Sequence, residues 1–148
     1  MEVNDYRLND AKGSMCHVVI KRFTDSGEDG SITVELWSYY TNVMRITYTV
    51  PDECYTAFAR GTFSTSTGRH INRFTNEFLG DNLYFHVKDA CGKDCGRLKC
   101  VLSVGKTNNA KAKQYFTRAL ANYSSSGKRF HDYTKSEIER FNANRWYY

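Results

Sequence analysis

The chain has 148 residues, of which 41% are hydrophobic and 25% charged, with a net charge of +5, and this balance predicts one folded domain rather than a disordered chain. No apolar run approaches the roughly 20 residues that a membrane-spanning helix needs. Because residues 1–14 are polar and acidic, unlike a signal or transit peptide, we expect a cytoplasmic protein.

The first two-thirds of the chain predict an antiparallel sheet. Residues 1–14 are expected to form a flexible arm. After them, short runs rich in β-branched residues alternate with turn-forming residues, which is typical of a meander. Strands are expected at Cys16–Phe23, on both sides of a turn at residues 40–42 within the run 31–50, at residues 54–63, at residues 82–88 and at residues 99–104.

Three segments have helical patterns. After the hydroxyl cluster at residues 64–67, apolar residues recur at helical spacing until Gly80, which is placed as a C-cap glycine. Residues 107–123 carry an apolar stripe of Tyr115, Phe116, Ala119, Leu120 and Tyr123, and the serines that follow are expected to end this helix. Thr134 and Glu137 form a capping-box pattern before a last helix. We therefore predict a single α+β domain over 1–148, with an antiparallel sheet of about four to six strands, two to three helices and a helical C-terminal third.

Charge divides the chain into an acidic and a basic part. Residues 1–85 carry 8 Lys and Arg against 11 Asp and Glu, whereas residues 86–148 carry 13 against 5. We expect a sheet-rich acidic part at 15–85, a junction at 86–105 and a basic helical part at 106–148. Basic and aromatic side chains together favour an anionic partner or a protein interface, although a solvated basic face is the alternative interpretation. The candidate partner-binding residues are Lys106, Lys111, Lys113, Arg118, Lys128, Arg129 and Trp146.

Three of the five cysteines fall in the junction, with the spacing Cys91-x3-Cys95-x4-Cys100. Zinc prefers four tetrahedral thiolate or imidazole ligands, and short spacings let one segment supply several of them. An odd cysteine count in a cytoplasmic protein also disfavours complete disulfide pairing. We expect a structural zinc ion at these three cysteines. His86 is the first choice for the fourth ligand, and Cys16, His17 and Cys54 are alternatives; unliganded thiols and a redox pair are the competing interpretations.

Motifs for catalysis are missing from the sequence. It contains neither the His-x-Glu pattern of zinc deaminases nor the His-Glu-x-x-His pattern of zinc proteases, and no phosphate-binding glycine loop. The hydroxyl cluster at residues 64–67, beside Arg69 and His70, has the composition to hold a phosphate, but capping of the helix is the simpler interpretation. We therefore predict no catalytic residues and no enzymatic activity.

Two phrases of the sequence are distinctive: S-Y-Y-T-N-V at residues 38–43 and F-S-T-S-T-G-R-H-I-N-R-F at residues 63–74. They resemble a small domain of unassigned function that recurs in phage and mobile-element proteins. The resemblance covers roughly residues 33–80. Asn42 stands where that domain usually has proline, and Gly68 stands where serine is more typical. The resemblance implies a phage-like origin.

By size and general build, the chain also resembles the inhibitors that phages use against type II CRISPR nucleases. This second resemblance implies a non-enzymatic inhibitor that binds a host Cas9-type nuclease and blocks its nucleic-acid binding or cleavage. The alternative is a small zinc-containing nucleic-acid-binding protein that uses the basic C-terminal half. Neither interpretation involves a membrane or a small-molecule substrate.

Overall fold

The computed structural model of the chain describes residues 2–9, 16–23, 30–38, 41–49, 54–59, 65–80, 100–103, 109–132 and 134–143. The strands are β1 (Glu2–Arg7), β2 (Cys16–Phe23), β3 (Ser31–Ser38), β4 (Thr41–Thr49), β5 (Cys54–Ala59), β6 (Cys100–Ser103) and β7 (Arg129–His131). The helices are α1 (Thr65–Leu79), α3 (Asn109–Ser126) and α4 (Lys135–Ala143). These elements confirm the predicted α+β class.

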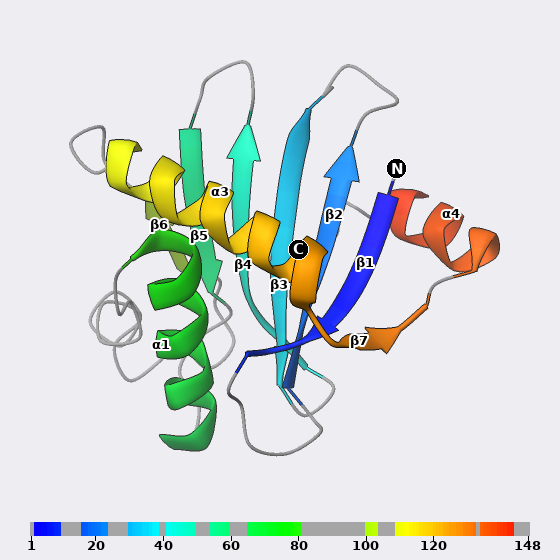
Figure 1. The fold of residues 1–148 in the computed structure, drawn as a ribbon, viewed down its shortest axis with the longest axis horizontal. Helices are drawn as coiled ribbons and strands as arrows, with labels where there is room; N and C mark the ends of the chain where they lie inside the picture. The colour runs from blue at the N-terminus through cyan, green and yellow to red at the C-terminus, as the bar shows by residue number, and fades with distance from the viewer. Residues whose placement is uncertain are drawn as a thin grey trace.

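The strands form one antiparallel sheet in the order β6-β5-β4-β3-β2-β1-β7. Strands β1 to β6 are a meander in which each strand pairs with the next, and β7 is added at the β1 edge. Helices α1 and α3 both lie over the same face of this sheet (Figure 1). Helix α4 follows β7 and lies beyond the β1 edge (Figure 1). Among the described helices, none has the length and hydropathy to span a membrane.

Period-two alternation in the central strands builds the core. Val18, Ile20, Val34 and Leu36 are all completely buried on the face that α1 and α3 cover. The two helices contribute a mainly aromatic layer against these aliphatic side chains, made of Ile71, Phe74, Phe78, Phe116 and Tyr123. The core therefore lies between the sheet and the two helices, and it fixes how α1 and α3 lie against each other.

Helix α1 ends at Gly80 for two physical reasons. Gly80 has a φ of 74°, a left-handed conformation that favours glycine, and its N–H donates to the Asn76 carbonyl at 3.0 Å. A Cβ at this position would also lie only 2.6 Å from Cδ2 of Tyr115. The predicted C-cap glycine is thus confirmed, and it also allows α3 to approach α1 closely.

The N-terminal arm predicted for residues 1–14 is wrong over Glu2–Arg7, which form strand β1. Val3 and Tyr6 are 8% and 4% exposed, and the whole strand pairs with β2 in antiparallel register. This strand was not predicted because four of its six residues, Glu2, Asn4, Asp5 and Arg7, are polar, although Asp5 is itself buried. Its length and pairing make it a full member of the sheet.

The serines at 124–126 do not end the helix as expected, because they form the last turn of α3. The Ser125 and Ser126 hydroxyls donate to the Asn122 carbonyl at 3.3 and 3.0 Å, so their polar groups are satisfied within the helix. The short strand β7 follows soon after, and it was not predicted.

The capping box of α4 is confirmed, since Thr134 and Glu137 exchange side chain to backbone hydrogen bonds of 3.0 and 3.3 Å.

The other predicted strands agree with the structure where it describes them. Strands β2, β3, β4, β5 and β6 lie within the predicted runs, and β4 begins at Thr41, inside the expected turn. The strand predicted at residues 82–88 lies outside the described residues, as does most of the junction at 86–105.

Candidate functional site

A groove with a volume of about 730 Å³ lies between α1 and α3. One wall is a stripe of α1 with Arg69, Asn72, Arg73 and Asn76, and the other is a stripe of α3 with Tyr115, Arg118, Ala119 and Asn122. Both stripes have the i, i+3, i+4, i+7 spacing that places side chains on one face of a helix. Asn9, just after β1, and Glu77 complete the lining. The groove is therefore formed by residues that are far apart in the sequence.

The lining of the groove carries a net positive charge. Its three arginines, Arg69, Arg73 and Arg118, are all exposed, and Glu77 is its single carboxylate. Glu77 Oε1 accepts a hydrogen bond of 3.1 Å from Asn9 Nδ2, so the amide of Asn9 partly satisfies the acid. The groove thus presents an excess of guanidinium groups to solvent, which favours an anionic ligand.

Tyr123 connects the segments that form the groove. Its ring is completely buried in the core, and its hydroxyl accepts a 3.0 Å hydrogen bond from the backbone N–H of Asn9. Burial raises the pKa of Tyr123 well above its ordinary value, and the nearby Glu77 carboxylate, which accepts from the hydroxyl, raises it further. The hydroxyl therefore stays protonated, and it ties α1, α3 and the end of β1 together.

The two distinctive phrases of the sequence meet where β3 ends and α1 begins. Ser38 Oγ lies 3.1 Å from His70 Nδ1 and 3.4 Å from Thr67 Oγ1. Burial lowers the pKa of His70 below its ordinary value, and the charge of Arg73 lowers it further, so the imidazole is neutral at neutral pH. These contacts attach the first turns of α1 to the sheet, and so they orient the arginine stripe.

The same cluster is poorly suited to nucleophilic chemistry. Ser38 is 2% exposed, so a substrate has little access to its hydroxyl. Cys16, its register partner on β2, is a buried free thiol, and burial raises the pKa of this thiol to about 12. Thr67 is buried and contacts Ser38, which agrees with a structural role for the hydroxyls at the start of α1.

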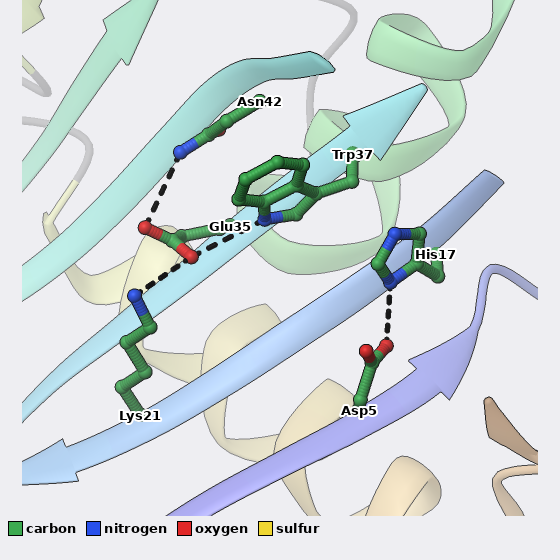
Figure 2. A network of polar contacts seen from close by, with 6 residues as sticks. All are labelled: Asp5, His17, Lys21, Glu35, Trp37 and Asn42. Atoms are coloured by element: carbon green, nitrogen blue, oxygen red, sulfur yellow. Dashed lines mark hydrogen bonds and ion pairs between the residues drawn. The ribbon is translucent and has the colours of Figure 1, made fainter. Parts of the chain in front are cut away.

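The opposite face of the sheet carries a second polar cluster (Figure 2). Glu35 is 1% exposed, and its carboxylate receives three donors. Lys21 Nζ lies 3.0 Å and Trp37 Nε1 3.3 Å from Oε1, while Asn42 Nδ2 donates to Oε2 at 3.2 Å. A register shift after Leu36 pairs Asn42 with Trp37 and so brings its amide to this face. The buried charge is therefore well compensated.

Asp5 and His17 form a second buried pair on this face (Figure 2). Asp5 Oδ1 and His17 Nδ1 are 2.6 Å apart, and their side chains are 1% and 13% exposed. The His17 ring stacks on Phe130 of β7, with a centroid separation of 4.0 Å and an interplanar angle of 10°. This stacking explains how the short strand β7 is held at the edge of the sheet.

The basic residues predicted as a binding patch are spread over different parts of the structure. Lys111, Lys113 and Arg118 are exposed on α3, but only Arg118 lines the groove. Arg129 lies at the β1 edge, where its Nη1 donates to Asn4 Oδ1 at 2.6 Å. Lys128 is exposed just before it, whereas Lys106 and Trp146 lie outside the described residues.

The predicted zinc ligands fall mostly where the structure gives no description. Cys91, Cys95 and His86 lie outside the described residues; Cys100 begins β6, and its side chain is likewise outside them, as is that of Cys54 in β5. The described part of the chain contains no group of three or more His, Cys, Asp or Glu residues suited to a metal ion. Of the alternative ligands, Cys16 belongs to the core under the helices, while His17 pairs with Asp5 on the opposite face.

Arg69 and Arg73 fall outside the basic half that the sequence predicted to bind a partner. A signal for them exists in the sequence, because Arg69, Asn72, Arg73 and Asn76 form a polar stripe along the predicted first helix. What the sequence does not contain is the position of this stripe relative to α3.

Comparisons of the chain with protein-family models, curated proteins and solved structures find no match.

Proposed function

We propose that this protein is a non-enzymatic binding protein whose α1–α3 groove binds the phosphate backbone of a nucleic acid. The observation that carries the proposal is the groove lining, with three exposed arginines against one carboxylate that is already hydrogen-bonded to Asn9. Arginine binds phosphate through paired N–H donors, and such contacts supply most of the affinity of sequence-independent nucleic-acid binding.

A nucleic acid fits this lining better than an acidic peptide does. The carboxylates of an acidic peptide would bind to the guanidinium groups alone. The groove lining also contains the amides of Asn72, Asn76 and Asn122 and the aromatic ring of Tyr115. Amides have both donors and acceptors and match the edges of bases, and aromatic or guanidinium planes match their faces. The mixed lining therefore favours a ligand with phosphates and bases.

Removal of the three groove arginines should abolish most of the binding. In fluorescence anisotropy with a labelled mixed-sequence strand of about 12 nucleotides, the wild type should show a slope of about −2 for log affinity against log salt, as expected for three phosphate contacts. Its affinity should then fall about sixteenfold between about 50 and about 200 mM salt. The triple variant Arg69→Ala, Arg73→Ala, Arg118→Ala should bind weakly, with a slope near zero.

The matched control removes the same charge elsewhere. Lys113, Lys128 and Lys135 are exposed and do not line the groove, so their triple replacement with alanine should retain most of the wild-type affinity. Equal losses in the two triple variants would show that net charge, not the groove, determines binding. Equally tight binding of a poly-glutamate peptide at the groove would overturn the nucleic-acid proposal in favour of an acidic protein partner.

Inhibition of a host Cas9-type nuclease is a second proposal, and the resemblance of the sequence to phage proteins supports it. An inhibitor that binds the nuclease directly should co-purify with it and reduce cleavage of target DNA, while showing little salt-dependent binding to free oligonucleotide. The two proposals therefore predict opposite results in the anisotropy experiment. An absence of both activities would contradict both.

A structural zinc ion at Cys91, Cys95 and Cys100 is a further proposal, supported by the spacing of these cysteines. Protein purified without chelator should contain about one equivalent of zinc by elemental analysis, and Cys95→Ser should lose it. A content below about a tenth of an equivalent in the wild type would contradict the zinc site.

A further inference from the structure

The lining of the groove includes a guanidinium group that lies over an aromatic ring. The guanidinium carbon of Arg118 lies 4.5 Å from the centroid of the Tyr115 ring. The ring itself is fixed, because its Cδ2 and Cε2 atoms come so close to Gly80 that a Cβ there would lie 2.6 and 2.7 Å away. Arg118 is exposed and lines the groove, so this pair offers a planar, supported surface to a ligand.

Two exposed amides lie on opposite walls of the same groove. Asn76 belongs to α1 and Asn122 to α3, and both line the groove with exposed side chains. A carboxamide can donate and accept at once, and with adenine it pairs through the N6 donor and the N7 acceptor. A flat ligand held on Arg118 would therefore find amide groups for its edges.

We propose that the groove binds single-stranded nucleic acid by taking in an unpaired base, which stacks on the Arg118–Tyr115 pair while Asn76 and Asn122 hydrogen-bond its edge. This inference rests on the proposed function and adds to it the class of ligand. The volume of about 730 Å³ lies within the range of roughly 300–1,000 Å³ that is usual for small-ligand pockets. There is thus room for a nucleotide unit, and Arg69 and Arg73 are exposed on the α1 wall, where flanking phosphates would pass.

The shape of the site also favours a single strand over a duplex. Proteins commonly read duplex DNA with a protruding helix or ribbon that enters the major groove, whereas here the charged residues line a hollow between two helices. In a duplex the faces of the bases are stacked and covered. In a single strand they are available to aromatic and guanidinium planes, and this is the usual mode of single-strand recognition.

The experiment compares strands that have equal numbers of phosphates but different bases. Labelled adenine, thymine and abasic strands of about 12 units are titrated with the full-length protein at one salt concentration, alongside a duplex of the same length and the matching RNA strands. The adenine strand should bind at least fivefold more tightly than the abasic strand, and the duplex should bind less tightly than either base-bearing strand. This preference in either the DNA or the RNA series supports the proposal. The series that binds with the higher affinity shows whether the ligand is DNA or RNA.

Two variants test the assigned roles. Arg118→Lys keeps the charge but removes the plane, so the ratio of adenine to abasic affinity should fall towards one. The wild type should bind the adenine strand more tightly than the thymine strand, because the amides match the N6 and N7 edge of adenine, and Asn76→Ala with Asn122→Ala should remove this difference. Lys113→Ala, on α3 but outside the groove lining, should keep both ratios.

The outcomes separate this inference from the proposed function. If the wild type binds the abasic strand as tightly as the adenine strand, and this binding still requires the groove arginines, then the unpaired base is ruled out and phosphate binding stands. A duplex that binds more tightly than the single strands would also overturn the inference. If none of the nucleic acids binds, both proposals fail.

Discussion

Replacing Glu35 with alanine should lower the free energy of unfolding by about 3–5 kcal/mol, because it removes the carboxylate that neutralises the buried Lys21 ammonium. The two side chains are 2% and 8% exposed, with 3.0 Å between Oε1 and Nζ. Trp37 and Asn42 would lose their acceptor at the same time. The loss is thus the cost of several buried donors left without this carboxylate, rather than the worth of one ion pair.

Urea denaturation followed by circular dichroism measures this loss of stability, and two further variants serve as controls. Glu2→Ala breaks the exposed Glu2–Arg22 contact of 3.5 Å and should cost less than about 1 kcal/mol. The double variant Lys21→Met, Glu35→Leu replaces both charges with apolar groups and should recover much of the stability lost in Glu35→Ala. A Glu35→Ala variant no less stable than Glu2→Ala would show that the buried pair contributes little.

The sequence predicts the strands in which apolar residues recur at every second position, and it misses β1, in which they do not. Strand β3 alternates in the expected way and was located correctly. Strand β1 looks like a polar arm because Asp5 is charged, yet Asp5 is buried against His17 of β2. The side chain of a charged residue in a strand normally faces solvent. Only the pairing of β1 with β2 shows that this charge has a buried partner, and that pairing is a long-range contact.

Of the residues that line the groove, only Arg118 is among the predicted partner-binding residues, and the reason for the others is geometric. Arg118 was expected to bind a partner because it lies in the basic part of the chain, whereas Arg69 lies in the part whose net charge is negative. The polar stripe of α1 can be read from the sequence, whereas Tyr115 and Ala119 of the α3 wall belong to the apolar stripe predicted for that helix. Whether the two walls meet depends on how the helices cross over the sheet. Phe78 and Gly80 determine this crossing through contacts with α3, and spacing along the chain does not reveal them.

Replacing Phe78 with alanine should destabilise the fold by about 3–5 kcal/mol, because it opens a cavity between α1 and α3. The Phe78 ring is completely buried, and its centroid lies 5.1 Å from Phe74, 5.8 Å from Phe116 and 5.6 Å from Tyr123. Chemical denaturation measures the loss. Phe78→Leu keeps most of the apolar volume and should cost less, about 1–2 kcal/mol. A loss below about 1 kcal/mol for the alanine variant would mean that the two helices do not depend on this contact.

Phe78→Ala and Glu35→Ala have similar expected costs but lie on opposite faces of the sheet, and this difference tests how the groove is built. Phe78 packs between the two helices that form the walls, so its removal should weaken nucleic-acid binding even where the variant is fully folded. Glu35 lies on the face away from α1 and α3 (Figure 2), so its removal should leave the affinity of the folded fraction unchanged. Anisotropy at low temperature, corrected for the folded fraction from circular dichroism, distinguishes the two variants. Equal affinities would mean that the groove arginines bind nucleic acid without a fixed spacing between the helices.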